Sequence, residues 1–91
     1  AYQDGKLYVA DTYNNKIKVI DVAKGVLKSL VGDGTGGLQD DPPRFNEPAG
    51  LSIAGDRLYV ADTNNHAIRV ISLAGKPTVR TLSFAGLQAP Q

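Results

Sequence analysis

The sequence contains no cysteine, a single histidine and no long apolar stretch. Without cysteine, neither a disulfide nor a thiolate metal site can form within these residues. No segment approaches the roughly 20 apolar residues that a membrane-spanning helix needs, so we expect no membrane partner. The N-terminal residues AYQDGK lack the apolar region of a targeting signal. A chain of 91 residues without disulfides or thiolate metal sites is marginally stable. We therefore expect it to depend on packing against neighbouring units.

Charges of the two signs are nearly balanced. Ten Lys and Arg residues stand against nine Asp and Glu residues, which gives a net charge of +1. Binding to polyanions through counterion release needs clustered basic residues. Nucleic acid is therefore an alternative partner that the composition does not favour.

A motif of fifteen residues occurs twice in the chain. LYVADTYNNKIKVID begins at Leu7 and LYVADTNNHAIRVIS begins at Leu58, 51 positions later, and ten of the fifteen residues are identical. Self-similarity at a period near 50 residues is typical of propellers and solenoids. Because one repeat unit cannot bury its own faces, we expect function to belong to an assembly larger than this chain.

Each copy of the motif has the pattern of a hairpin, with two apolar segments on either side of an Asn-rich turn. A further apolar segment follows each hairpin, and another precedes the second one. We therefore predict an all-β fold of antiparallel strands, divided into a three-stranded partial blade and a four-stranded blade, with no helix longer than a turn. The seven expected strands are Leu7–Asp11, Ile17–Asp21, Val26–Leu30, Gly50–Ala54, Leu58–Asp62, Ile68–Ser72 and Thr78–Leu82.

The hairpin strands are apolar on both faces, which is typical of a sheet enclosed between neighbours. Lys28 and Arg80 alternate with apolar residues in the last strand of each unit, as charged residues do on a protected sheet edge. We expect these two side chains to be exposed. The residues expected to be largely buried between the blades are Leu7, Val9, Ile17, Val19, Leu58, Val60, Ile68 and Val70.

The motif P-x-G-L before the second hairpin, together with L-Y-V-A-D-T-x-N-x-x-I across each hairpin, resembles the NHL repeat. This resemblance implies blades of a six-bladed β-propeller. The segment GDGTGGLQDDPPRFNEPAGLSI followed by LYVADTNNHAIRVI is similar to the last blades of proteins that join a thioredoxin-like domain to an NHL propeller. Residues 1–5 lack P-x-G-L, so we expect the first blade to lack its first strand.

On this resemblance the chain divides into four parts. Residues 1–31 form a partial blade, 32–47 an inter-blade loop, 48–84 a complete blade and 85–91 a tail leading to the next element. Such a chain exposes apolar faces and an unpaired strand edge. We therefore expect the partners to be the remaining blades of a larger propeller or further copies of the chain.

Polar residues at the hairpin turns are candidates for chemistry. A carboxylate that ends a strand can accept hydrogen bonds from turn amides, and Asn tolerates the left-handed backbone of a tight turn, here Asn14 or Asn65. Asp62 as a metal ligand or base is the functional alternative, but its repetition as Asp11 favours a structural role. The predicted structural turn residues are Asp11, Thr12, Asn14, Asp62, Thr63 and Asn65.

Other candidate sites have weaker patterns. His66 has no second His, no Cys and no carboxylate cluster at ligand spacing, so we expect an exposed turn residue. The loop 32–47 is acidic and Gly-rich, but it matches neither a calcium-binding nor a phosphate-binding motif. We expect Phe45 to anchor this loop between the blades while its acids stay solvated. No catalytic residue, cofactor or metal is predicted.

Three functions compete at this stage. The favoured one is a noncatalytic scaffold for an unknown protein partner, and the alternatives are an RNA-binding propeller and a metal-dependent propeller lyase. RNA binding would use a basic face with stacking aromatics, to which Tyr13 and the basic residues Lys16, Lys18, Lys24, Lys28, Arg69 and Arg80 would contribute. Fold alone does not decide among these functions. The predicted interaction surface comprises Tyr13, Lys16, Asp40, Asp41, Arg44 and His66.

Overall fold

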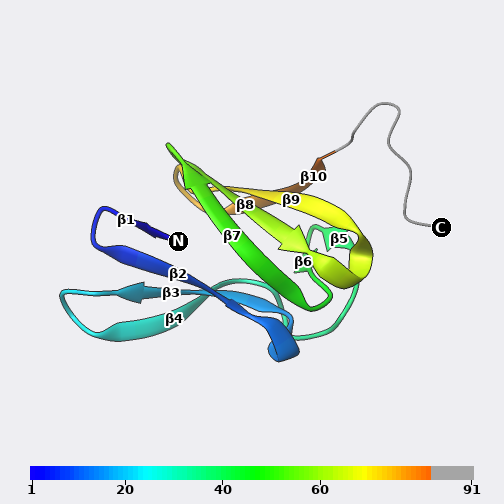
Figure 1. Ribbon diagram of the computed structural model, residues 1–91, viewed down its shortest axis with the longest axis horizontal. Helices are drawn as coiled ribbons and strands as arrows, with labels where there is room; N and C mark the ends of the chain where they lie inside the picture. Colours follow the sequence, from blue (N-terminus) through cyan, green and yellow to red (C-terminus); the bar gives the residue numbers. More distant parts are fainter. Residues whose placement is uncertain (83–91) are drawn as a thin grey trace.

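The computed structural model describes residues 1–82, which form antiparallel strands joined by tight turns (Figure 1). One four-stranded sheet contains, in spatial order, β1 (Tyr2–Gln3), β2 (Lys6–Asp11), β3 (Lys16–Asp21) and β4 (Val26–Val31). A second contains β7 (Pro48–Ala54), β8 (Arg57–Asp62), β9 (Ala67–Ser72) and β10 (Thr78–Leu82). We call them the first and the second sheet. The predicted all-β, antiparallel fold is confirmed.

The remaining elements are short. A small hairpin of β5 (Gln39–Asp40) and β6 (Pro43–Arg44) lies in the segment between the two sheets. The 3-10 turns η1 (Thr12–Asn14) and η2 (Thr63–Asn65) connect the central strands of each sheet. Within residues 1–82, no helix has the length and apolar character to cross a membrane. The predicted tail at 85–91 lies outside the described residues.

The first sheet has four strands, so the expected three-stranded partial blade is wrong. Its first strand, β1, pairs with β2 through Tyr2 opposite Leu7 and Gln3 opposite Lys6. Asp4 and Gly5 both have positive φ angles, 52° and 79°. An Asp-Gly pair with positive φ at both positions is the preferred two-residue hairpin turn. Because this turn is so short, the two residues before it can pair with the first residues of β2.

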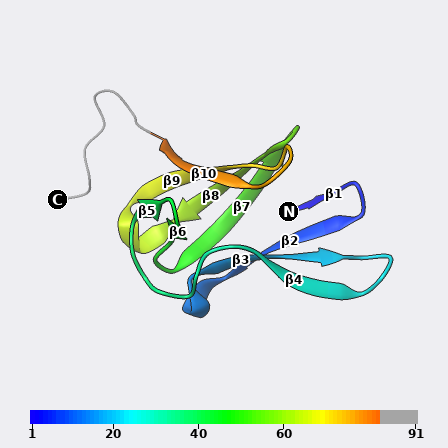
Figure 2. The same ribbon diagram turned by 180° about the vertical axis from the view of Figure 1, so that it is seen from behind.

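The two sheets lie side by side and pack through unlike faces (Figures 1 and 2). Successive side chains of a strand point to opposite faces, so each sheet has a leucine face, carrying Leu7 or Leu58, and a tyrosine face, carrying Tyr8 or Tyr59. The tyrosine face of the first sheet packs against the leucine face of the second. The core cluster accordingly joins Tyr8, Ile17 and Val19 of the first sheet to Leu58, Val60, Ile71 and Val79 of the second.

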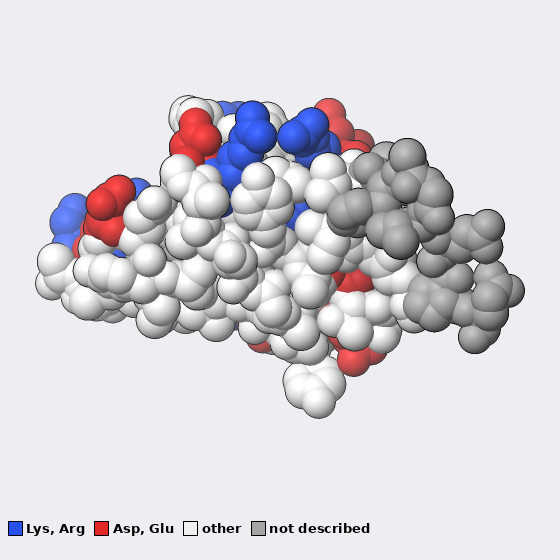
Figure 3. All heavy atoms as spheres, turned by 45° about the horizontal axis from the view of Figure 1, so that its top comes forward, with Lys and Arg blue, Asp and Glu red and all other residues white. Residues whose placement is uncertain are grey.

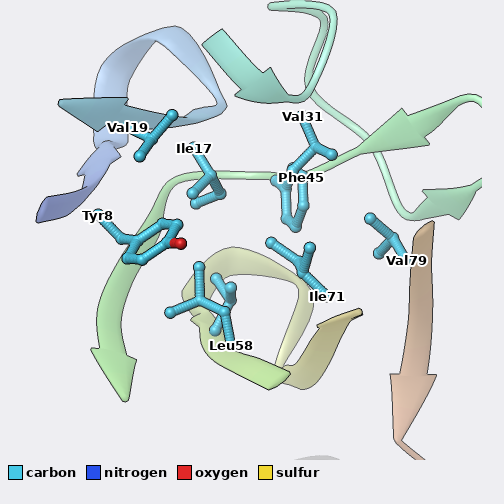
Figure 4. Close-up of a cluster of buried hydrophobic side chains, with 9 residues drawn as sticks. Tyr8, Ile17, Val19, Val31, Phe45, Leu58, Ile71 and Val79 are labelled. Atoms are coloured by element: carbon cyan, nitrogen blue, oxygen red, sulfur yellow. The ribbon is translucent and has the colours of Figure 1, made fainter. Parts of the chain in front are cut away.

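Phe45 completes this core. Its side chain is fully buried, and Figure 4 shows it between Val31 of the first sheet and Ile71 of the second. Burial of a Phe side chain removes a large apolar surface from water. The segment between the sheets is therefore anchored in the core, as the sequence predicted for Phe45.

Burial follows the predicted list with three exceptions. Five of the eight residues are buried: Ile17, Val19, Leu58, Val60 and Val70. Leu7 is exposed, and Val9 and Ile68 are only half-buried, so the expectation was wrong for them. Leu7 and Val9 belong to the leucine face of the first sheet, and Ile68 belongs to the tyrosine face of the second. Neither of these faces takes part in the packing between the two sheets, although Val70, which shares the face of Ile68, is buried. Lys28 and Arg80 are exposed, as predicted.

Candidate interaction surface

Both hairpin turns have the same backbone. A 3-10 turn of three residues follows the strand, and the next residue is left-handed, with φ of 56° at Asn15 and 51° at His66. The amides of Asn15 and His66 donate to the carbonyls of Thr12 and Thr63. The prediction of a left-handed Asn14 and Asn65 was wrong by one residue, because the 3-10 turn delays the reversal by one position. Asn and His are among the residues enriched at positive φ.

Asp62 is the centre of the second turn. It is completely buried, and it accepts hydrogen bonds from the backbone amide of Asn46 (2.8 Å), Nδ2 of Asn65 (2.8 Å) and NH1 of Arg69 (2.9 Å). The turn supplies one donor as predicted, the side-chain amide of Asn65, but none of the three donors is a backbone amide of the turn itself. Instead the carboxylate joins its turn to the inter-sheet segment and to β9.

Asp11 repeats this arrangement in a more open setting. It accepts hydrogen bonds from Nδ2 of Asn14 (3.0 Å) and Nζ of Lys18 (2.6 Å). About a quarter of each side chain in this ion pair is exposed (24% for Asp11 and 27% for Lys18). The bonds from Lys18 and then Asn14 hold the pKa of Asp11 below its ordinary value.

Arg69 is the residue whose role the sequence interpretation missed. It was grouped with the surface cations, but its side chain is fully buried. The guanidinium lies 4.8 Å from the centre of the Phe45 ring. It donates to four oxygens: the carbonyls of Arg44 (2.6 Å) and Gln39 (2.6 Å) and the carboxylates of Asp62 (2.9 Å) and Asp40 (2.8 Å). The one available signal was its place between Ile68 and Val70 in an apolar strand.

Asp40 and Asp41 of the inter-sheet segment are exposed, as expected, but Asp40 is also held by hydrogen bonds. Asp40 binds Arg69 and also accepts from Oγ1 of Thr81 (3.0 Å), although 44% of its side chain is exposed. Burial raises the pKa of Asp40, but the hydrogen bonds from Arg69 and Thr81 outweigh it and leave this pKa below the ordinary value. Asp33 pairs with Nε of Arg44 at 2.9 Å, and this bond likewise lowers the pKa of Asp33. Asp41 is exposed.

Residues 46 and 47 tie the two turns together. The amide of Glu47 donates to Oδ1 of Asn15 (2.8 Å), and the amide of Asn64 donates to the carbonyl of Asn46 (3.1 Å). Nδ2 of Asn64 also donates to the Glu47 carboxylate. The two turns and the segment between the sheets thus form one continuous surface, which we call the turn end and define by residues 12–15, 46–47 and 63–66.

A glycine lets the segment leave the first sheet close to this surface. Gly32 has a φ of 101°, and a Cβ atom added there would lie 2.7 Å from the carbonyl oxygen of Asn15. Any larger residue would clash with the backbone of the first turn. Gly32 therefore brings the segment against the turn, where Nδ2 of Asn15 donates to the Gly34 carbonyl at 3.4 Å.

The structure separates the predicted interaction residues into two groups. Tyr13, with 88% of its surface exposed, lies with the exposed His66 at the turn end. Lys16 is half-buried beside the first turn. The other three, Asp40, Asp41 and Arg44, belong to the β5–β6 hairpin, where a groove of about 550 Å³ is lined by Asp40, Asp41, Pro42, Pro43, Lys76 and Pro77, together with Thr78 and Val79. The sequence interpretation missed Asn15 and Asn64, for which the Asn-rich turns were the available signal, and Asn46 and Glu47, which lie in the segment between the sheets.

Charged groups of both signs are interspersed over the described surface. On the face drawn in Figure 3, Lys and Arg atoms lie in small groups beside Asp and Glu atoms, around a broad uncharged belt. Lys18 and Arg44 each carry an acidic partner. Among residues 1–82, no three His, Cys, Asp or Glu side chains gather in a way that could hold a metal ion.

Comparison with known proteins relates the chain to one repeat family. Residues 45–71 match the family model of the NHL repeat. The chain is 42% identical over 93 residues to the Arabidopsis thaliana protein named Protein SUPPRESSOR OF QUENCHING 1, chloroplastic, an alignment covering 96% of this chain and 9% of that protein. It is 49% identical over 76 residues to NHL repeat-containing protein 2 of Homo sapiens and of Bos taurus, covering 77% of this chain and 10% of each relative. The chain thus spans about a tenth of the length of these curated relatives.

Proposed function

Because the chain belongs to the NHL-repeat family, we propose that it is a noncatalytic segment of a propeller whose turn end binds a protein partner. The observation that carries this proposal is Tyr13, an aromatic side chain with 88% exposure on a turn that side-chain hydrogen bonds hold in place. A large aromatic presented by a rigid backbone loses little entropy on binding, and Tyr is enriched at the centres of protein interfaces. The link to a thioredoxin-like parent stays a prediction.

The hydrogen bonds of the Asp side chains support a structural role for these carboxylates rather than a catalytic one. Asp11, Asp33, Asp40 and Asp62 each accept hydrogen bonds from a basic side chain and from a further protein group. A general base or a metal ligand needs lone pairs directed at a substrate or an ion. The metal-dependent lyase remains the least supported alternative, and stoichiometric metal in the purified chain would favour it.

RNA binding is the second candidate, and the same Tyr13 favours it because exposed aromatics stack on bases. A phosphate-tracking groove also needs several free cations. Near the turn end, Lys18 and Arg44 are paired with Asp11 and Asp33, and Lys16 is half-buried. We therefore favour a protein over RNA as the partner of the turn end.

The test is capture of partners by the 91-residue chain and by Tyr13→Ser, from nuclease-treated and untreated extracts. Val22→Ser is the matched control, because Val22 is 52% exposed and lies in the β3–β4 turn outside the turn end. We expect a protein that binds the wild type and Val22→Ser but is lost with Tyr13→Ser, in both extracts. Capture that survives Tyr13→Ser would overturn the proposal. Capture that depends on Tyr13 only before nuclease treatment would support the RNA alternative instead.

A further inference from the structure

A small basic pocket lies on the tyrosine face of the first sheet, near the β3–β4 turn and at the opposite end of β3 from the turn end (Figure 1). Its volume is about 260 Å³. The residues that line it are Lys6, Val19, Asp21, Lys24, Val26 and Lys28. Val19 also belongs to the core between the two sheets. The pocket therefore opens beside a contact that the chain itself makes.

The strand register brings these side chains together. Lys6 of β2 is opposite Asp21 of β3. Two residues away on the same face of the sheet, Val19 of β3 is opposite Lys28 of β4. The amide of Lys24 donates to Oδ1 of Asp21 at 3.2 Å, which holds the β3–β4 turn beside the two rows. Residues from three strands and one turn thus converge on one pocket.

Positive charge dominates this pocket. Its three Lys residues are exposed, and none of them forms an ion pair within residues 1–82. Asp21 is the one carboxylate among the lining residues, so the pocket has an excess of two positive charges. A phosphate monoester carries close to two negative charges at pH 7, and Lys binds phosphate as a point charge. The pocket and such a dianion are therefore complementary in charge.

The second sheet has basic residues at two of the same strand positions. Arg57 and Arg80 match Lys6 and Lys28 at offsets of 51 and 52, and they line a hollow of about 190 Å³ together with Val70. Protection of a sheet edge explains a charge on the outer strands β4 and β10. It does not explain one on β2 and β8, which are internal strands of their sheets. The repeated basic pair therefore points to a shared role in binding an anion.

We propose that the pocket of the first sheet binds the phosphate group of a small organic phosphate monoester. The ammonium groups of Lys6, Lys24 and Lys28 contact the phosphate oxygens, and the organic part rests on Val19 and Val26. The volume lies just below the range of about 300–1,000 Å³ that is typical of sites for drug-sized ligands, so the ligand is small. The pocket is separate from the turn end, and the proposal does not depend on the protein partner proposed there.

Propyl phosphate is the probe, added to the isotopically labelled 91-residue chain at low ionic strength and at a pH above about 7, where the phosphate is a dianion. Amide chemical shifts in NMR spectra report both the site and the Kd. We expect saturable shifts that are largest in the β3–β4 turn, with a Kd of about 1 mM or lower. Propyl sulfate has a similar shape but a single charge, and it should bind at least about three-fold more weakly. Equal binding of the two probes, or shifts that do not saturate or that lie elsewhere, would overturn the proposal.

A third probe separates a small ester from a phosphorylated protein segment. A tripeptide of phosphoserine between two alanines, blocked at both ends, carries the same phosphate group on a backbone that is large for this pocket. We expect it to bind more weakly than propyl phosphate. Tighter binding of the peptide would overturn the assignment to a small ester and would indicate a phosphorylated partner instead.

Substitutions of single charges test the residues. Lys6 also lines a neighbouring hollow that contains Asp4 and Asp56, so Lys24 and Lys28 give the sharper test. Lys24→Gln and Lys28→Gln should each weaken binding of propyl phosphate about two- to five-fold, the effect of one exposed charge.

Asp21→Asn should change the Kd in the opposite direction. It removes the one negative charge of the pocket but keeps an oxygen for the amide of Lys24, so binding should become tighter. Lys76→Gln is the matched control, because Lys76 is an exposed turn residue outside the pocket, and it should bind like the wild type. Circular dichroism verifies the fold of each variant. Wild-type affinity in both pocket Lys variants, or an equal loss in Lys76→Gln, would overturn the proposal.

Discussion

The two copies of the repeated motif place the same acid and a basic residue at the same positions, yet they surround them differently. In the first copy the Asp11–Lys18 pair is about one quarter exposed, whereas in the second the Asp62–Arg69 pair is fully buried. The difference lies in the segment between the sheets, which covers the second pair with two carbonyls, a carboxylate and the Phe45 ring. The local sequence sets the turn, and a distant segment sets whether the ion pair is buried.

The basic residue fits its setting in each copy. Arg presents a planar fork of donors, which suits a buried site with several acceptors, while Lys is a compact and strongly hydrated charge. Arg69 uses two of its nitrogens to bind four oxygens. Lys18 binds one carboxylate near solvent. The two residues are therefore not interchangeable.

The largest expected effect comes from breaking the buried pair. Arg69→Ala leaves Asp62 buried and without its cation, and removal of one partner of a buried ion pair costs about 3–5 kcal/mol. Lys18→Ala should stay close to the wild type, because exposed ion pairs contribute little. Urea denaturation of dilute samples measures both. Equal losses of stability in the two variants would show that the inter-sheet segment does not distinguish the copies.

A second matched pair compares the apolar positions. Leu58→Ala opens a cavity at a fully buried site and should lower the free energy of unfolding by about 2–5 kcal/mol. Leu7→Ala removes a side chain that is 37% exposed, and its effect should be less than half as large. The same denaturation experiment applies, and a larger effect at Leu7 would contradict the assignment of the faces.

The pH dependence tests the link between Asp40 and Arg69. Because the pKa of Asp40 is lowered in the folded chain, the folded state binds fewer protons, and the stabilisation is present above the unfolded pKa of about 4. It should be lost as the pH falls through and below that value. Asp40→Asn should flatten the acid limb of a plot of stability against pH. An acid limb identical to that of the wild type would show that ionisation of Asp40 does not contribute to the stability of the fold.

The smallest effects are expected at the edge strands. Lys28→Ala and Arg80→Ala change exposed side chains and should each shift the free energy of unfolding by no more than about 0.5 kcal/mol. A loss comparable to that of Leu58→Ala at either position would mean that the strand is packed against another surface.

Much of this architecture was predictable because it is encoded locally. The doubled motif and its apolar segments indicated seven of the ten strands within residues 1–82, the antiparallel hairpins and the turns. The first strand was not predicted because it is only two residues long and depends on the Asp4-Gly5 turn, and the left-handed residues were misplaced by one because the turn is a 3-10 turn. Burial of Arg69 was not predictable from its neighbours, since three of its four acceptors lie 25 to 30 residues away in the chain. Long-range contacts of this kind have no local pattern.

Residue-resolved hydrogen exchange tests most directly the claim that the inter-sheet segment makes the two copies unequal. In samples dilute enough to be monomeric, the account predicts slower exchange for the paired amides of β8 and β9 than for the equivalent amides of β2 and β3, because buried and covered strands open less often. Arg69→Ala should bring the two hairpins closer together in exchange rate. Equal protection of both hairpins in the wild type, or greater protection of β2 and β3, would contradict it.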